Sequence, residues 1–247
     1  MKTICIIQAR MGSTRLLGKI LLPLEGKPLL LRVVDRVLKA ESVDEIIVAT
    51  TTKERDEKIV ELIKNYNPKV SAYRGSEEDV LDRYYQAVKE KNPDLVVRVT
   101  SDNPFIDPDI INKTVQEFKD DPSLEYASNN IGEHTYPRGL DTEAIKFTTL
   151  KKLWETTTES VDREHVTIHV KRFPNNFKWK TIKADKDYSK YRLTVDEESD
   201  YKLTQELYKI LEKEKPDFRM QDVIKVLENN PDLFTINSHV EQKNKKY

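Results

Sequence analysis

The sequence predicts an α/β fold, with a doubly wound and mainly parallel sheet of the Rossmann-like type. Apolar runs that are short enough for buried strands lie at 3–7, 45–50 and 95–99. Segments whose apolar residues recur every three or four positions, as on one face of a helix, lie at 30–38, 80–88 and 110–118. Strands that alternate with helices in this way are typical of βαβ units, whose consecutive strands run parallel.

The pattern changes after residue 118. We expect strands at 125–129, 143–147, 177–183 and 191–195, and a short helix that contains 150–154. The segment 165–173 fits either a helix or a strand. Amphipathic helices are expected at 203–211 and 223–227, before a polar tail at 242–247 that we expect to fray. The prediction is one domain, 1–247, with a β-rich insertion at 125–195.

Composition excludes several classes of protein. The chain has 247 residues, enough for a core without disulfide support, and its one cysteine, Cys5, excludes a disulfide framework or a cysteine zinc site. Its 42 Lys and Arg against 43 Asp and Glu argue against a nucleic-acid-binding surface. No apolar stretch approaches the roughly 20 residues of a membrane span, and the run at 4–7 is too short for a signal peptide. We therefore expect a cytoplasmic protein that binds neither membranes nor nucleic acid.

The loop after the first predicted strand carries the features of an anion-binding site. Ligands in open α/β sheets lie beyond the carboxyl ends of the strands. This loop, 9–19, begins at Ala9 and contains small residues that let backbone N–H groups approach phosphates: Gly12, Ser13 and Thr14. It also contains three cations that can neutralise phosphate oxygens: Arg10, Arg15 and Lys19. The loop is neither a Walker A motif nor a G-x-G-x-x-G motif. A polyphosphate site is favoured over a turn with solvated cations.

Two aspartates follow predicted strands and are candidate metal ligands. Asp102 follows the strand at 95–99, and Asp196 follows the strand at 191–195. Carboxylate oxygens suit a hard divalent cation, and two strand ends can bring distant residues together over one phosphate chain. The alternatives are that Asp102 belongs to a turn and that the acidic run at 196–200 caps the following helix.

Seven segments of the chain, in order, resemble one enzyme family. They are 6–19 (IIQARMGSTRLLGK), 26–28 (GKP), 74–85 (RGSEEDVLDRYY), 101–104 (SDNP), 136–141 (YPRGLD), 163–167 (REHVT) and 193–196 (LTVD). These segments are similar to those of the cytidylyltransferases that make CMP-activated acidic sugars, the CMP-Kdo and CMP-sialic acid synthetases. The nearest branch is that of the CMP-Kdo synthetase homologues in spore-coat polysaccharide biosynthesis.

The resemblance implies a nucleotidyltransferase-type fold and a reaction. The reaction is transfer of CMP from CTP to an acidic sugar of the Kdo or nonulosonate type, with release of pyrophosphate, in cell-surface or spore polysaccharide biosynthesis. Arg10, Arg15 and Lys19 would act on the triphosphate, and Asp102 and Asp196 would hold Mg²⁺. Relatives commonly dimerise through the inserted segment, so a homodimer is expected.

The resemblance also places residues around the base and ribose: Gly75, Ser76, Asp79, Arg83 and Thr100. From the residues alone, Ser76 and Asp79 can instead cap the helix that starts near residue 80, and Arg83 can pair with Asp79. Thr100 stands where the Kdo branch has glutamine, and a hydroxyl reads a base edge less distinctively than an amide does.

The segment 136–141 is the best candidate for binding the acceptor. Its residues with suitable chemistry are Tyr136, Arg138, Gly139 and Asp141, and the resemblance adds His165. The guanidinium of Arg138 offers two parallel N–H donors to a carboxylate, the group that these acidic sugars share. An ordinary Pro-Gly turn is the alternative for the segment, and a packed or capping role is the alternative for His165.

Two other functions remain open from the sequence. A nucleotidyltransferase of the same fold can act on a sugar phosphate or a phosphonate, which Arg138 would also bind. A nucleotide-binding module without catalysis is the second alternative, and the joint presence of Lys19, Asp102 and Asp196 argues against it.

Overall fold

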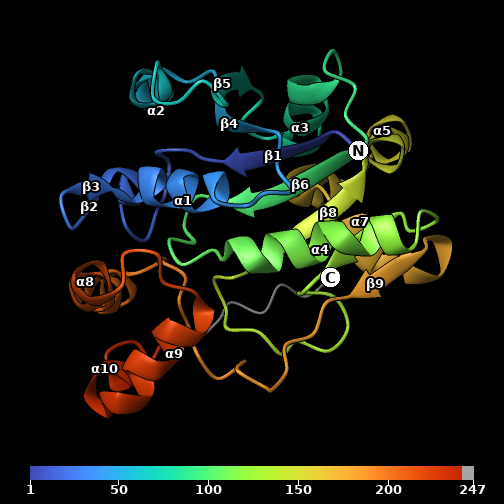
Figure 1. Cartoon of the computed structure of the whole chain (residues 1–247). Coiled ribbons are helices and arrows are strands. Elements are labelled where there is room, and N and C mark those ends of the chain that lie inside the picture. The colour runs from blue at the N-terminus through green and yellow to red at the C-terminus, as the bar shows by residue number, and fades with distance from the viewer. Residues whose placement is uncertain (241–247) are drawn as a thin grey trace.

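A computed structural model describes residues 1–240, so the tail predicted at 242–247 lies outside the described residues. Its centre is a seven-stranded sheet with the order β5-β4-β1-β6-β8-β7-β9 (Figure 1). Neighbouring strands are parallel except where β8 pairs antiparallel with β6 and with β7. The strands are β1 (Thr3–Gln8), β4 (Glu45–Thr51), β5 (Val70–Gly75), β6 (Leu95–Thr100), β7 (Tyr126–Ser128), β8 (Glu143–Lys146) and β9 (Trp179–Thr181). The predicted α/β fold class is confirmed.

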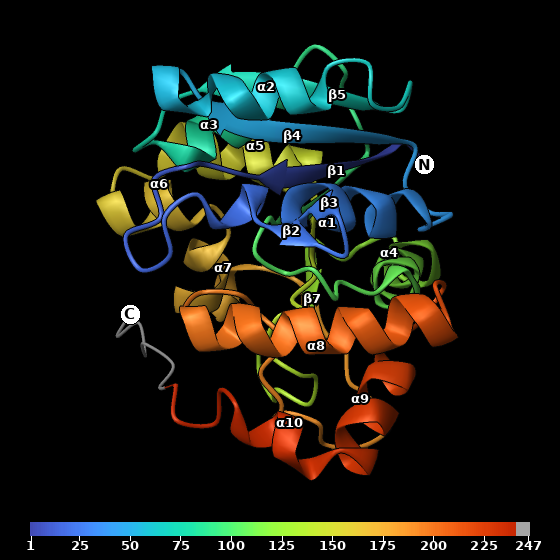
Figure 2. The same ribbon diagram turned by 90° about the vertical axis from the view of Figure 1, so that its left-hand side faces the viewer.

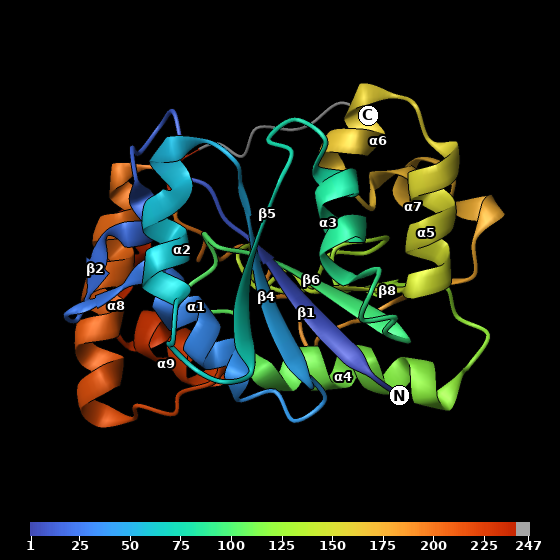
Figure 3. The same ribbon diagram turned by 90° about the horizontal axis from the view of Figure 1, so that it is seen from above.

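Helices cover both faces of this sheet, as the view from above shows (Figure 3). One face carries α1 (Leu29–Leu38), α2 (Glu57–Ile63), α4 (Pro108–Asp120), α8 (Glu198–Glu214) and α9 (Met220–Asn229). The other face carries α3 (Val80–Val88), α5 (Phe147–Thr156), α6 (Ser160–His165) and α7 (Ile168–Arg172). The remaining elements are η1 (Lys19–Leu21), η2 (Glu54–Asp56), η3 (Pro174–Asn176), α10 (Pro231–Thr235) and a hairpin of β2 (Pro23–Leu24) with β3 (Lys27–Pro28).

The central strands are apolar throughout because both of their faces are covered. In β1, Cys5 and Ile7 join the core under α1 and α4, whereas Ile4 and Ile6 join the core under α3 and α5. A strand that is buried on both faces loses the polar alternation of a half-exposed strand. Among residues 1–240, no helix is both long enough and apolar enough to cross a bilayer.

Two predicted features differ from the structure. The segment 191–195 makes only an isolated bridge between Arg138 and Arg192, because its other backbone groups bond to single loop partners such as the carbonyl of Asp102. The insertion 125–195 is not β-rich: its three short strands extend the main sheet, and it also contains α5, α6 and α7. The ambiguous segment at 165–173 is helical over most of its length.

A buried ion pair joins β6 to β8. Glu143 is 2% exposed, and its carboxylate lies 2.8 Å from Nη1 of Arg98 and 3.5 Å from Nζ of Lys171. It also accepts hydrogen bonds from Tyr126, Asn130 and Thr167. Burial alone would raise the pKa of Glu143, but Lys171, Arg98 and these hydrogen bonds hold it below its ordinary value. Glu143 therefore stays charged inside the fold.

Candidate active site

The carboxyl ends of β1, β4 and β6 lie at one edge of the sheet, on the left in Figure 2. The loop after β1 reaches this edge and turns at Gly18, whose φ of 62° is the left-handed conformation that glycine adopts without a steric penalty. This turn starts η1 at Lys19 and sends its side chain inward. The turn at Gly18 thus positions Lys19, a residue of the predicted site.

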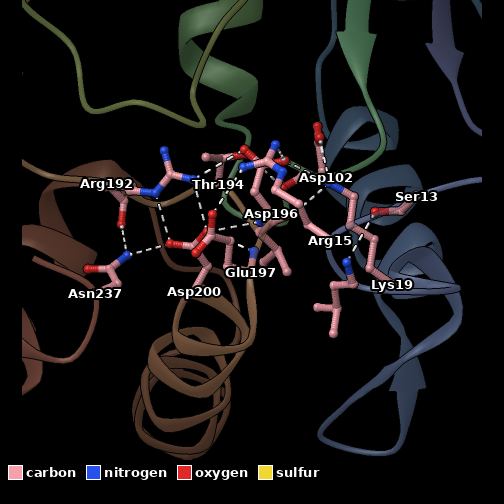
Figure 4. Close-up of polar contacts among 12 residues, drawn as sticks. Ser13, Arg15, Lys19, Asp102, Arg192, Thr194, Asp196, Glu197, Asp200 and Asn237 are labelled. Atoms are coloured by element: carbon pink, nitrogen blue, oxygen red, sulfur yellow. Dashed lines mark hydrogen bonds and ion pairs between the residues drawn. The ribbon is translucent and has the colours of Figure 1, made fainter. Parts of the chain in front are cut away.

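Lys19 connects the two candidate metal ligands (Figure 4). Its Nζ lies 2.9 Å from Oδ2 of Asp102 and 3.0 Å from Oδ1 of Asp196. It also donates to the carbonyl of Val195 at 2.7 Å. Three segments that are far apart in the sequence therefore meet at one ammonium group, and the predicted convergence of Asp102 with Asp196 is confirmed.

Backbone hydrogen bonds hold the two aspartate segments together. The N–H of Val195 donates to the carbonyl of Asp102 at 2.9 Å, and Oγ1 of Thr194 donates to the same carbonyl at 3.3 Å. Asp102 lies two residues after the end of β6, so the strand fixes the position of the Asp102 carbonyl to which 194–196 is bonded. The relative position of the two carboxylates is therefore set mainly by the main chain.

The N-terminus of α8 supports Asp196 from the other side (Figure 4). Glu197 and Asp200 form a capping box at the start of α8. The acidic run therefore caps the helix through these two residues, whereas Asp196 pairs with Lys19. Asp200 is 1% exposed and accepts bonds from Nε and Nη2 of Arg192, both at 2.9 Å. Arg192 in turn donates to Oδ2 of Asp196 at 3.1 Å. Sequence reasoning missed Arg192, and it considered Asp200 only as part of the acidic run that caps the helix.

Replacing Asp200 with asparagine should destabilise the protein, because Asp200 is the buried counter-ion that orients Arg192. We expect the free energy of unfolding to fall by about 1–3 kcal/mol, the usual cost of unpairing a buried charged group. Urea denaturation measures this. Asp217→Asn is the matched control, since Asp217 also pairs with an arginine, Arg219, and in addition with Lys39, but its side chain is 65% exposed. Equal losses in both variants would contradict the role given to Asp200.

Mutual charge compensation fixes the protonation states at this centre. Burial would raise the pKa of Asp196, but Lys19, Arg15 and Arg192 hold it below its ordinary value. Burial would lower the pKa of Lys19, but Asp102 and Asp196 raise it instead. Arg15 lies 2.9 Å from Asp196. Lys19 and Asp196 are therefore both charged at neutral pH.

The donor set of the two aspartates fits Mg²⁺. Both carboxylates already face one cationic group, and Mg²⁺ binds carboxylate oxygen through one or two residues while phosphates and water complete its shell. Within residues 1–240 no three His, Cys, Asp or Glu side chains are grouped to hold a metal by themselves. This arrangement suits a metal that binds together with a polyphosphate.

The predicted phosphate loop, 9–19, is held by residues beyond the carboxyl end of β4 that sequence reasoning missed. Buried Asp56 accepts the N–H of Met11 at 2.7 Å. The guanidinium of Arg55 packs on Gly12 so closely that a Cβ there would lie 3.0 Å from Nη2 of Arg55. The rule that ligand residues follow strand ends, applied to β4 as it was to β1, would have found both.

The predicted loop residues divide between two places. Arg15 joins Lys19 and Asp196, whereas Arg10 is half-exposed and lies 3.9 Å from Glu77. Ala9 is buried and bonds to β4 through its N–H. Ser13 accepts the N–H of Leu16, and Thr14 is exposed.

The residues predicted near the base and ribose form a separate group at the start of α3. Asp79 accepts the N–H of Asp82 at 2.9 Å and caps the helix, and Ser76 accepts the N–H of Asp79 itself at 3.0 Å. Asp79 also pairs with Arg163 at 2.5 Å rather than with Arg83. The alternative that Arg83 pairs with Asp79 is therefore wrong, because the partner of Asp79 is 84 residues away in the sequence.

Arg83 is a buried guanidinium with few partners. It is 2% exposed, and Nη1 donates to the carbonyl of Ser76 at 2.7 Å. In the described chain its Nε has no hydrogen-bond partner, and burial lowers its pKa. A Cβ at Gly75 would lie 2.9 Å from Cγ of Arg83, so this close packing requires glycine. Thr100 lies two residues before Asp102, and its Oγ1 accepts a hydrogen bond from Nδ2 of Asn103 at 3.0 Å.

The predicted acceptor segment lies beside the segment that carries Asp196. Gly139 has φ 98°, and a Cβ there would lie 2.4 Å from the N of Thr194, so only glycine fits. Arg138 is exposed and lines an open cleft of about 240 Å³ together with Lys190 and Arg192. Within residues 1–240 the guanidinium of Arg138 shows no hydrogen bond or ion pair.

The other predicted acceptor residues lie in different surroundings. Tyr136, which was predicted to bind the acceptor, lies instead in the core and is 4% exposed. Its hydroxyl donates to the carbonyl of Lys183, and burial raises its pKa to about 12. Asp141 lies 3.7 Å from Nε2 of His134. His165 ends α6, before a tight turn at Val166 with φ 58°. Arg138 and Gly139 thus lie next to the segment that leads to Asp196.

Comparison with known proteins agrees with this geometry. The cytidylyltransferase family model matches residues 4–242. The chain is similar to the spore coat polysaccharide biosynthesis protein SpsF of Bacillus subtilis, with 33% identity over 93% of this chain and 95% of that protein. It is 37% identical to a 3-deoxy-manno-octulosonate cytidylyltransferase of Geotalea daltonii over 50% of this chain and 47% of that protein. A solved cytidylyltransferase from Leptospira borgpetersenii matches with a TM-score of 0.89 and 33% identity, covering 100% of this chain and 99% of that one.

The family match spans nearly the whole chain, and the solved structure shares the complete fold. The resemblance inferred from the seven sequence segments is therefore confirmed. The chain belongs to the cytidylyltransferase family, and its activity is the transfer of CMP from CTP to a sugar-like acceptor.

Proposed function

We propose that the acceptor is an acidic sugar of the Kdo or nonulosonate type and that the reaction serves cell-surface or spore polysaccharide biosynthesis. The observation that carries the proposal is the meeting of Lys19, Asp102 and Asp196 beside the phosphate loop. The similarity to a spore coat polysaccharide biosynthesis protein and to an octulosonate cytidylyltransferase supports the choice of acceptor.

In this proposal the cations and the loop bind the triphosphate. Arg15 and Lys19 neutralise charge as pyrophosphate leaves, Arg10 contributes from the other end of the loop, and the N–H groups of 12–14 contact phosphate oxygens. Asp102 and Asp196 would hold Mg²⁺, which would supply positive charge to the phosphates and Lewis acidity to the acceptor hydroxyl.

The base and ribose occupy the group at the start of α3. Arg83 is the main candidate donor, since its buried guanidinium has an Nε without a partner in the described chain. Gly75 and Ser76 lie against it, and Asp79 positions the helix start. Thr100 ends β6, and we keep it as a candidate for the base. A buried donor without a partner favours a ligand acceptor such as a base carbonyl.

Arg138 binds the carboxylate of the acceptor, with Asp141 and His165 as candidates for its hydroxyls. We also propose a homodimer through the segment 125–195, which light scattering tests. Arg138→Met should raise the KM for the acceptor about 10- to 100-fold, the loss of a charge-assisted pair of hydrogen bonds, and leave the KM for CTP unchanged. Steady-state kinetics measure this split. A parallel rise in both KM values would place Arg138 outside the acceptor subsite.

Pyrophosphate release tests the proposed function. CTP, UTP, GTP and ATP are each paired with Kdo, a nonulosonic acid, a sugar phosphate and a phosphonate, and we expect the highest kcat/KM with CTP and an acidic sugar. A higher kcat/KM with a phosphorylated or phosphonate acceptor would favour the alternative substrate class. If no acceptor gives turnover, the non-catalytic module would be the better account.

A further inference from the structure

The ammonium group of Lys19 has no free donor in its present position. It has three N–H groups, and they meet Oδ2 of Asp102, Oδ1 of Asp196 and the carbonyl of Val195 at 2.9, 3.0 and 2.7 Å. The Lys19 side chain is 10% exposed, so water has little access to it. To donate to a phosphate oxygen, Lys19 must give up at least one of these contacts.

The same ammonium lies where a bridging metal would bind. Mg²⁺ lies about 2.0–2.1 Å from its oxygen ligands. An ion joined to one oxygen of each aspartate would come close to a nitrogen that is already within 3.0 Å of both oxygens. Two cations that close together repel strongly where solvent is scarce. Lys19 and a metal ion therefore compete for one pair of carboxylates.

The two carboxylates depend on Lys19 to different degrees. Asp196 also has Arg15 at 2.9 Å and Arg192 at 3.1 Å. Asp102, by contrast, has Lys19 as its one ion-pair partner among residues 1–240. If Lys19 leaves and nothing replaces it, the carboxylate of Asp102 faces that of Asp196 without its own counter-ion.

We propose that Lys19 and Mg²⁺ exchange places during substrate binding. Lys19 holds the cation position between Asp102 and Asp196 until a metal–triphosphate complex arrives. Asp102 and Asp196 would then hold the metal, and the released ammonium of Lys19 would turn to the triphosphate. The identity of the triphosphate rests on the proposed function, but the competition between Lys19 and the metal does not.

The exchange makes metal and nucleotide binding cooperative. A metal alone would displace Lys19 to a position with no anion to meet it, and a triphosphate alone would draw Lys19 away from two carboxylates. When both bind, each of these charges has a partner. By linkage, the metal and the nucleotide must raise each other's affinity for the protein by the same factor.

Metal binding without nucleotide tests the proposal. The Lys19→Met variant removes the ammonium and keeps a side chain of similar length. We expect it to bind Mn²⁺ at least about tenfold more tightly than the unaltered protein in the absence of nucleotide, a typical size for coupling between sites. Electron paramagnetic resonance of free Mn²⁺ measures the affinity, and calorimetry with Mg²⁺ repeats it.

Two controls identify the site. Lys27→Met removes the lysine of another ion pair, that with Asp35 at 2.6 Å, and should leave Mn²⁺ affinity unchanged. Adding Asp102→Asn to Lys19→Met should abolish the gain. Lys19→Gln is the second variant if Lys19→Met does not fold, because its amide still donates to a carboxylate without carrying charge. Circular dichroism confirms that each variant is folded.

A folded variant without the Lys19 charge that binds Mn²⁺ no more tightly than the unaltered protein would overturn the proposal. A gain that survives the added Asp102→Asn change would also overturn it. The test is separate from the proposed function. Tighter Mn²⁺ binding without CMP transfer to any acidic sugar would contradict that function alone, whereas turnover without tighter Mn²⁺ binding would contradict the exchange alone.

Discussion

Asp102→Asn and Asp196→Asn are each expected to lower kcat/KM by about 100-fold or more. Both carboxylates face one cationic position beside the phosphate loop, and losing an interaction that stabilises transition-state charge typically has an effect of this size. Asparagine keeps the shape of the side chain and an oxygen that can accept from Lys19, so the fold should persist. Pyrophosphate release at saturating Mg²⁺ measures the loss.

Several controls accompany these variants. The double variant should lose little more activity than either single one, because residues that act as a unit are not additive. Asp35→Asn breaks the ion pair with Lys27 and should retain full activity. Removing divalent metal with EDTA should abolish turnover, and added Mg²⁺ should restore it. Wild-type kcat/KM in either single variant would remove that aspartate from the reaction centre.

Glu143→Gln is expected to have the largest effect on stability. The change leaves Arg98 and Lys171 without their shared counter-ion inside the sheet, and breaking one side of a buried ion pair costs about 3–5 kcal/mol. Chemical denaturation measures it. Glu45→Gln is the matched control, because Glu45 also starts a strand and also pairs with two cations, Lys2 and Lys91, but is 33% exposed. We expect the control to lose less than about 1 kcal/mol. Similar losses in both variants would contradict the importance of burial.

The same pair predicts how stability depends on pH. The pKa of Glu143 lies below its ordinary value in the folded protein, so around and below the ordinary glutamate pKa of about 4.3 the unfolded chain binds more protons at this site. Its contribution to stability is therefore complete above that pH and is lost as the pH falls. Between pH 6 and pH 3, the free energy of unfolding should fall more steeply for the unaltered protein than for Glu143→Gln. Equal slopes would show that Glu143 has an ordinary pKa.

The parts of the fold that could be predicted from the sequence are those buried on both sides. β1, β4 and β6 are covered by helices on both faces, so each is an apolar run. β5 was missed because it lies at the edge of the sheet, and its sequence VSAYRG has no such run. The segment 191–195 has the composition of a strand, but its partners are single loop residues, which no local pattern reveals.

The candidate site likewise has a part that the sequence could predict and a part that it could not. The positions of Asp102 and Lys19 could be predicted because the carboxyl ends of parallel strands meet at one edge. The family resemblance implied a metal role for both Asp102 and Asp196, which stays a prediction. The contacts that hold these residues in place could not be predicted from the sequence. The pair of Asp79 with Arg163 joins residues 84 positions apart, so it depends on tertiary packing. Arg192, Asp196 and Asp200 are close in the sequence, but their contacts form only because 192–196 leads into α8.

A crystal structure with Mg²⁺ and a CTP analogue that cannot be cleaved between the α- and β-phosphates tests the central claim most directly. The account predicts one Mg²⁺ at about 2.1 Å from an oxygen of Asp102 and from an oxygen of Asp196. The Nζ of Lys19 should then lie within hydrogen-bonding distance of a phosphate oxygen. A triphosphate bound elsewhere, for example in the cleft beside Arg138, with Lys19 still between the two aspartates, would contradict the account.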